Sequence, residues 1–196
     1  MKSIYNFVVK PKGQRYNNIK KIGDSELIVN TEIFNHQYVN REAVVTSSPI
    51  IGDTDIKPGD TVIVHHNVFR RWHNQHGIEK NSRSYFNENT YFLSNDQIFL
   101  YKRNKNWISP KGYCFVKPLK DVNNFNIDTE KPLQGIVKYS DGTVNVSDLI
   151  GFTPNSEYEF IVDGERLYRI LSKFITIKYE YQGNEEEYNP SWAKSS

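Results

Sequence analysis

Four histidines lie close together in the chain and are the first residues whose type and spacing could do chemistry. They are His65, His66, His73 and His76. Imidazole is the commonest protein ligand of transition metals, and a tetrahedral zinc site needs three or four ligands that converge. The spacing matches no known ligand signature, and Arg70 and Arg71 between the histidines would repel a cation. We therefore expect no metal site here and interpret the stretch as a solvated loop.

Cationic and aromatic side chains are interleaved in two segments. One is Arg70-Arg71-Trp72, and the other covers residues 101–107 and ends at Trp107. Grooves that bind single-stranded nucleic acid combine such residues, because bases stack on aromatic rings and cations attract phosphates. The formal net charge is only +2, with 25 basic and 23 acidic residues, so the chain as a whole has no nucleic-acid footprint. Solvated segments with cation–π contacts are the favoured interpretation, and nucleic acid is not the expected partner.

A nucleophile for covalent catalysis is not apparent in the sequence. The motif Gly-x-Ser-x-Gly is absent, and the single cysteine, Cys114, lies between Tyr113 and Phe115. These neighbours favour a thiol that packs in the core over an activated thiolate. One cysteine also excludes an intrachain disulfide and a cysteine-based zinc cluster, which fits a reducing compartment. We expect no enzymatic activity and no cofactor.

The composition favours an all-β protein. Hydrophobic residues make up 37% of the chain and aromatic residues 14%, which excludes a disordered chain. Long helices are disfavoured, because alanine, the best helix former, occurs only at positions 43 and 193. The start of the chain lacks the apolar core of a signal peptide, and no run approaches the ~20 apolar residues of a membrane span. We expect a soluble, cytoplasmic protein without a membrane partner.

A turn followed by a strand organises the first half of the chain. Lys57-Pro58-Gly59-Asp60 predicts a tight turn, because proline presets φ at the second position and glycine supplies a positive φ at the third. The β-branched run over 61–64 predicts the strand that follows. Further strands are predicted where apolar runs end at turn signals, over 5–11, 42–46, 91–93 and 97–101.

A long polar segment separates the first two of these strands. It contains the turn signal Gly23-Asp24 and one apolar island, Leu27-Ile28-Val29. Loops of about twenty residues inside a compact domain are unusual and tend to be functional or mobile. The island can be a docking anchor that becomes ordered on binding, or an ordinary core strand. A second long segment, 67–89, has no helical or strand period, and we expect an elaborated loop there.

Four features of the first half recur in the same order after Ser109-Pro110-Lys111-Gly112, which marks a boundary. The first strand is matched by 113–118, Ala43-Val44-Val45 by Gly135-Ile136-Val137, the central turn by 153–156, and the closing strand by 173–177. This recurrence predicts a degenerate duplication, with one small β-barrel over 1–107 and a second over 112–181. The charged segment 182–196 is expected to be a flexible tail.

The order of these elements resembles that of the GroES-type co-chaperonins. That family has an N-terminal strand, a mobile loop with a glycine and an apolar tripeptide, a Gly-x-Val strand, a Gly-Asp-x-Val turn and strand, and a final Asp-Ile-Leu-like strand. Here these places are taken by residues 7–10, Gly23 with Leu27-Ile28-Val29, and residues 42–45, 59–62 and 96–100. The similarity covers residues 4–101 and, more loosely, 113–180. The segment 67–89 has no counterpart in the family.

The resemblance implies two tandem small GroES-like β-barrels that act as a co-chaperonin. Such a protein caps a GroEL-like chaperonin ring and assists protein folding, and it forms a homo-oligomeric ring by pairing terminal strands. Leu27, Ile28 and Val29 would bind the chaperonin from a mobile loop over about 12–38. The equivalent segment of the second half, 120–131, keeps three apolar residues between polar ones, at Val122, Phe125 and Ile127. We expect that segment not to dock.

A tandem, loop-elaborated member of the family is what the resemblance leads us to expect of a bacteriophage protein.

Two other functions stay open at this stage. An OB-like barrel that binds single-stranded nucleic acid is one alternative, and it would depend on Arg70, Arg71 and Trp107. A viral structural or interaction protein is the other.

Overall fold

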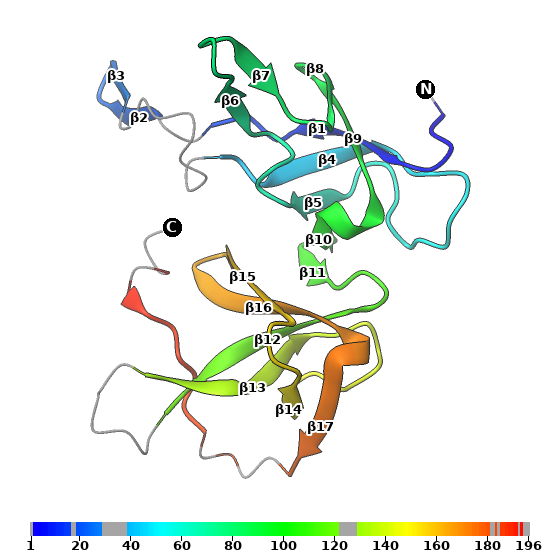
Figure 1. Ribbon diagram of the computed structural model, residues 1–196, viewed down its shortest axis with the longest axis vertical. Helices are drawn as coiled ribbons and strands as arrows, with labels where there is room; N and C mark the ends of the chain where they lie inside the picture. Colours follow the sequence, from blue (N-terminus) through cyan, green and yellow to red (C-terminus); the bar gives the residue numbers. More distant parts are fainter. Residues whose placement is uncertain are drawn as a thin grey trace. The chain divides into compact units, whose positions relative to one another are not determined.

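The computed structural model describes residues 2–16, 19–28, 39–121, 129–180, 183, 185–191 and 193. The chain divides into two compact units, Met1–Asn106 and Trp107–Ser196 (Figure 1). Every regular element in the described ranges is a β-strand or a short 3-10 helix, so the predicted all-β class is confirmed. No helix in these ranges is long and apolar enough to cross a membrane.

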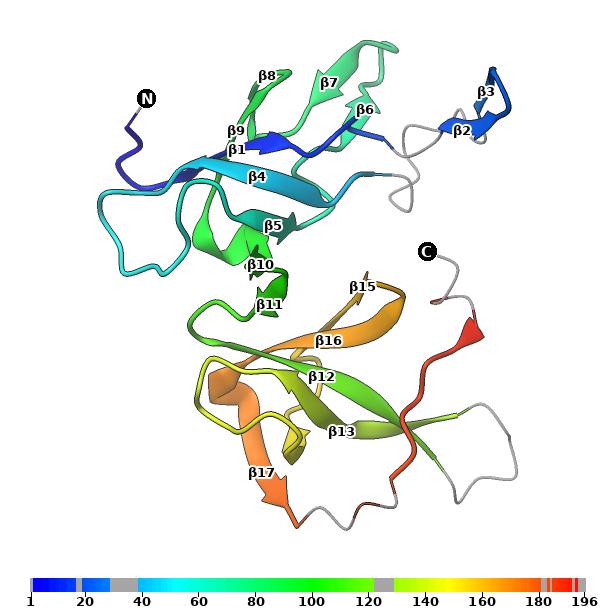
Figure 2. The same cartoon turned by 180° about the vertical axis from the view of Figure 1, so that it is seen from behind.

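The first unit is built from short antiparallel strands. Their bounds are β1 (Phe7–Pro11), β2 (Ile19–Ile22), β3 (Ser25–Ile28), β4 (Glu42–Ser47), β5 (Thr61–Val64), β6 (Arg71–His73), β7 (Glu79–Asn81), β8 (Tyr85–Asn87), β9 (Thr90–Leu93) and β10 (Ile98–Arg103). The 3-10 helix η2 (Asn95–Gln97) connects β9 to β10, and β11 (Asn106–Ile108) begins at the last residue of this unit. The large sheet has the order β11-β10-β5-β4-β1-β9-β8, whereas β2–β3 and β6–β7 are separate hairpins (Figures 1 and 2).

The second unit contains one antiparallel sheet. Its strands are β12 (Tyr113–Lys120), β13 (Glu130–Tyr139), β14 (Leu149–Phe152), β15 (Glu157–Val162), β16 (Glu165–Leu171) and β17 (Ile175–Tyr179). The 3-10 helix η3 (Ser172–Phe174) connects β16 to β17. The hydrogen-bonded order is β15-β16-β12-β13-β14-β17.

The two large sheets share one topology. Without β11, the first sheet has the order β8-β9-β1-β4-β5-β10, and each strand of the second sheet takes the same place in chain order. The register also repeats, because Val9 pairs with Val45 in the first sheet as Val116 pairs with Val137 in the second. The predicted correspondences of the first, second and closing strands are therefore confirmed.

The predicted correspondence of the central turn is wrong. The turn over 57–60 precedes β5, and the place of β5 in the second sheet belongs to β14. Its counterpart is therefore the turn over 145–148 and not the turn over 153–156. The sequence conceals this relation because Ser147 stands where Gly59 supplies a positive φ, and both residues have one, 71° and 95°.

The predicted barrels are not observed as closed hydrogen-bonded sheets. Among the described residues no ladder joins β8 to β11 in the first sheet, or β15 to β17 in the second. Closure requires an edge strand to find a full row of backbone partners, and the edge strands β8 and β11 are only three residues long.

Each unit encloses its own apolar core. In the first unit the buried side chains come from all the long strands and include Phe7, Val9, Val45, Val64, Phe69, Tyr91, Leu93, Phe99 and Leu100. In the second they include Cys114, Phe115, Val116, Val137, Ile150, Phe160, Leu167 and Ile170. Cys114 is completely buried, so the prediction of a core thiol is confirmed.

Two segments make contacts that the sequence does not predict. The segment 67–89 contains β6, β7 and β8, whose three-residue lengths are too short to leave a period-two pattern. In the segment 182–196 the Tyr188 amide donates to the Pro118 carbonyl oxygen at 2.8 Å, and Glu187 pairs with Lys117 at 2.8 Å. The segment 67–89 therefore contains regular elements, and the flexible tail over 182–196 stays a prediction.

Candidate functional site

The predicted docking residues belong to the hairpin β2–β3. Gly23 and Asp24 form its two-residue turn, and Gly23 has a φ of 60°, which glycine adopts without strain. Within the described chain this hairpin pairs with no strand of the large sheet, and Figure 1 draws it beside that sheet. The interpretation of Leu27 as part of a core strand therefore has no support in the strand pairing.

One face of the hairpin carries exposed apolar side chains. Leu27 is 54% exposed, and Ile22 is 58% exposed. Ile22 pairs with Ser25, two residues before Leu27, so Ile22 and Leu27 are diagonal neighbours on one face. Ile28 ends β3 opposite Ile19, and Val29 lies outside the described residues. Sequence reasoning missed Ile22, although its place beside the Gly23 turn was a usable signal.

A buried asparagine closes the base of this loop. Asn40 is 4% exposed, and its side-chain amide donates to the carbonyl oxygens of Lys12 at 3.0 Å and Gln14 at 2.8 Å. Its side-chain oxygen accepts a hydrogen bond from the Glu42 amide at 2.8 Å. All four residues flank the loop, so Asn40 ties the segment that enters the loop to the segment that leaves it.

The inserted segment, residues 67–89, also contacts the base of this loop, through Arg15. The Arg15 side chain is 9% exposed and donates to the Phe69 carbonyl oxygen at 3.1 Å and to Asn81 Oδ1 at 2.9 Å. The same guanidinium lies 3.6 Å from the Glu88 carboxylate. The insertion therefore positions the root of the loop, a role that the sequence did not reveal.

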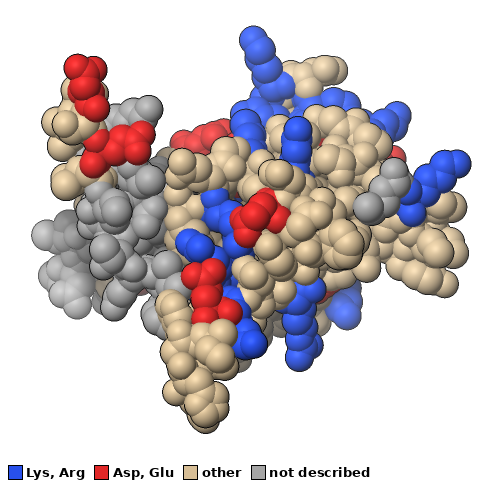
Figure 3. Space-filling view, turned by 90° about the horizontal axis from the view of Figure 1, so that it is seen from above, with Lys and Arg blue, Asp and Glu red and all other residues tan. Residues whose placement is uncertain are grey.

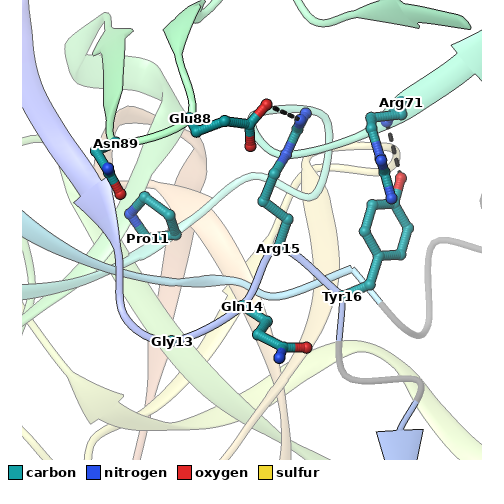
Figure 4. Close-up of a pocket in the computed structure, with 8 residues that line it drawn as sticks. All are labelled: Pro11, Gly13, Gln14, Arg15, Tyr16, Arg71, Glu88 and Asn89. Atoms are coloured by element: carbon teal, nitrogen blue, oxygen red, sulfur yellow. Dashed lines mark hydrogen bonds and ion pairs between the residues drawn. The ribbon is translucent and has the colours of Figure 1, made fainter.

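A polar cavity of about 440 Å³ lies at this junction. Figure 4 shows Arg15 pointing toward Glu88 and Tyr16 toward Arg71 at its wall. The Arg71 amide donates to the Tyr16 hydroxyl at 2.8 Å. The cations at this cavity have acidic partners, because Arg71 also pairs with Glu79 at 3.3 Å. This arrangement stabilises the junction and leaves little charge for a ligand.

A second cavity, of about 600 Å³, opens on the inserted segment. Its lining includes Arg70, Trp72, Ser82, Arg83, Ser84 and Gln97. Of Arg70, Arg71 and Trp107, on which the nucleic-acid alternative depends, only Arg70 lines this cavity. Trp107 is 9% exposed, and its indole N–H donates to Asp163 at 2.7 Å. The predicted nucleic-acid set is therefore not brought together.

The histidines do not form a cluster of ligands. The rings of His65 and His66 are 4.3 Å apart, whereas His73 belongs to β6 and His76 to the turn that follows it. In the part of the chain that the structure describes, no three His, Cys, Asp or Glu side chains are grouped to hold a metal ion. No protein-family model and no curated protein matches this chain, so its function has to be inferred from these sites.

Proposed function

We propose that this protein is a GroES-like co-chaperonin that caps a GroEL-like chaperonin ring and assists folding without chemistry of its own. The observation that carries the proposal is the hairpin β2–β3, which exposes Ile22 and Leu27 on one face. Exposed apolar pairs on a hairpin outside the main sheet favour docking into an apolar groove of a partner. The hydrogen bonds of Asn40 and Arg15 at the base of the loop support the same role, because they fix the position from which the docking hairpin extends.

The order of elements supports the assignment to this family. β1, the loop with its hairpin, β4, the Gly59-Asp60 turn, β5 and the closing strand β10 follow one another as the resemblance requires. The same six-strand order in the second unit supports a tandem of two GroES-like domains. We propose both as open forms of the family's barrel.

The energetics favour several weak contacts over one strong contact. Complete burial of an aliphatic side chain contributes about 1.5–3 kcal/mol, so Ile22 and Leu27 together supply no more than about 6 kcal/mol. Association of two bodies costs about 4–15 kcal/mol, which leaves a single hairpin with low affinity. Useful capping therefore requires several hairpins to engage together, and the lid can then leave when the partner changes state.

An exposed apolar patch supports the oligomeric part of the proposal. Ile4 and Tyr5 are 56% and 71% exposed, and Ile50 and Ile51 are 64% and 54% exposed. The two segments are neighbours, because the Ile51 amide donates to the Ile4 carbonyl oxygen at 2.9 Å. A patch of four large apolar side chains is typical of an interface between proteins. We propose that it is covered by a neighbouring copy in a homo-oligomeric ring.

Replacement of Leu27, Ile28 and Val29 by serine tests the docking loop. We expect the variant to lose capture of a GroEL-like chaperonin, while its melting temperature stays within about 2 °C of the original, because an exposed hairpin contributes little to the folded core. Ile78→Ser is the matched control, since Ile78 is 55% exposed outside the loop. Retained capture by the triple variant would reject the proposed site, and a large drop in melting temperature would show that these residues belong to the core.

A further inference from the structure

The second cavity, of about 600 Å³, is a well-defined pocket that has no part in the proposed co-chaperonin function. Its walls come from the segment before β6, from the connection between β7 and β8, and from η2. Internal hydrogen bonds fix these walls. Ser82 Oγ donates to the Val68 carbonyl oxygen at 2.5 Å, and Gln97 Nε2 donates to Ser84 Oγ at 3.3 Å. Ser84 is 4% exposed, so the floor of the cavity belongs to the folded core.

Two arginines without internal partners give this cavity its charge. Arg70 and Arg83 line it, its lining contains no acidic residue, and neither arginine forms a hydrogen bond or ion pair with any residue that the structure describes. Arg70 Nε is buried without an acceptor. A buried guanidinium N–H is costly to leave unsatisfied, and the planar guanidinium matches the oxygens of a phosphate.

Other arginines of the same unit behave differently. Arg15, Arg71 and Arg103 each have a carboxylate partner, at 3.6, 3.3 and 2.6 Å. The two arginines of the cavity therefore differ from these three, since neither has a carboxylate partner among the described residues. A bound anion would supply the negative charge and the hydrogen-bond acceptors that the fold does not provide for Arg70 and Arg83.

An aromatic ring completes the recognition surface. Trp72 lines the cavity and is 37% exposed, so one part of its indole is available to a planar ligand. Nucleobases stack on such rings, and their phosphates bind arginines. The volume of about 600 Å³ falls within the range of about 300–1,000 Å³ for small-molecule sites.

We propose that this cavity binds a nucleoside phosphate, with the base against Trp72 and the phosphate between Arg70 and Arg83. This chemistry occurs both in free nucleotides and in single-stranded nucleic acid. On the face seen in Figure 3, Lys and Arg side chains lie among Asp, Glu and other side chains. The low formal net charge of +2 favours a free nucleotide over an extended strand.

Titration of the full-length protein with 5′-AMP, inorganic phosphate and the oligonucleotide (dT)12 tests the proposal. We expect saturable binding of AMP, followed by calorimetry. Arg70→Gln with Arg83→Gln should weaken it at least about tenfold, since each charge-assisted contact to phosphate is lost. Trp72→Leu should weaken AMP binding but leave phosphate binding unchanged. Lys2→Gln with Lys105→Gln is the control, because it removes the same charge away from the cavity.

The relative affinities of the three ligands show whether the cavity binds free nucleotides or single-stranded nucleic acid. Tighter binding of AMP assigns the cavity to free nucleotides, and tighter binding of (dT)12 assigns it to single-stranded nucleic acid. Absence of saturable binding to all three ligands would overturn the proposal, as would a double arginine variant that binds as well as the original. If that double variant does not fold, Arg83→Gln alone replaces it, because Arg83 is exposed. Chaperonin capture by these variants should be unchanged, so the two proposals fail independently.

Discussion

At the scale of single residues, one aspartate in each unit closes the central turn and links it to the last strand. Asp60 accepts hydrogen bonds from the Lys57 amide at 2.8 Å and from Arg103 at 2.6 Å. Asp148 repeats this role, since it lies 2.8 Å from Lys178 of β17. The Gly-Asp pair that suggests a family resemblance therefore has a structural task, which is to connect the start of one strand to the end of another.

The pH dependence of stability follows from these contacts. Burial raises the pKa of Asp60, but the hydrogen bonds from Arg103 and from the Lys57 amide outweigh this effect and hold the pKa below its usual range. Asp60 therefore stabilises the fold fully above its unfolded pKa, and this contribution is lost as the pH falls through the lower folded pKa. The relevant window lies below about pH 4.

Asp60→Asn should destabilise the first unit by about 1–3 kcal/mol at pH 7, because a charge-assisted contact becomes a neutral one. Urea unfolding at pH 7 and pH 3 should show a smaller difference between the two proteins at the lower pH. Asp148→Asn should have a smaller effect, since Lys178 is 55% exposed and its pair is screened by water. An equal difference at both pH values would show that the charge of Asp60 is not what stabilises the turn.

At the scale of elements, the loop that carries β2–β3 depends on a base that is far more buried than the hairpin. Asn40 is 4% exposed, whereas Leu27 is 54% exposed. Because the base of the loop is fixed, the docking side chains of the hairpin sample fewer positions. Less conformational entropy is therefore lost on binding. Arg15 connects this base to the inserted segment, so the insertion supports the loop from within the same unit.

Asn40→Asp tests the base. The aspartate would place a buried carboxylate against the carbonyl oxygens of Lys12 and Gln14, where Asn40 now donates two hydrogen bonds. We expect a loss of about 2–4 kcal/mol in the free energy of unfolding at pH 7, measured with urea. Asn89→Asp is the control at an exposed position of the same unit. A loss below about 0.5 kcal/mol would show that the base is not held by Asn40.

At the scale of the whole chain, the sheets of the two units share one strand order, whereas their loops differ. The first unit has the long loop between β1 and β4 and the inserted segment 67–89. In the second unit the corresponding connection, between β12 and β13, is shorter, and the Asp121 amide donates to the Thr129 carbonyl oxygen at 2.9 Å. If only the first unit docks, each chain contributes one contact, and a multivalent lid has to come from several chains.

The apolar patch predicts how those chains associate. We expect light scattering to give a mass that is a multiple of the chain mass, and Ile4→Ser with Tyr5→Ser to shift it toward the monomer, because two of the four patch side chains are removed. Ile78→Ser should leave the mass unchanged. A wild-type protein that stays monomeric at high concentration would contradict the ring, and it would leave the nucleotide site untouched.

The sequence by itself determined the features that local physics encodes. Scarce alanine and β-branched runs established the all-β class, and Pro58-Gly59 established the central turn. The match between the first strand and residues 113–118 rests on a shared Val-Lys-Pro tripeptide, Val9–Pro11 in β1 and Val116–Pro118 in β12, and it correctly indicated two strands with the same register. These features depend on neighbours in the chain, so propensity and pattern are enough to recognise them.

Only the tertiary structure decided the contacts between residues that are distant in sequence. It assigned the second central turn to Ser147 rather than to Asn155, because strand order and not turn composition defines the equivalence. It also joined Asn40 to Lys12 and brought Arg83 and Gln97 to one cavity. Which hydrogen bonds and cavities form depends on how the sheets bring separate segments together, and local propensity contains no information about that choice.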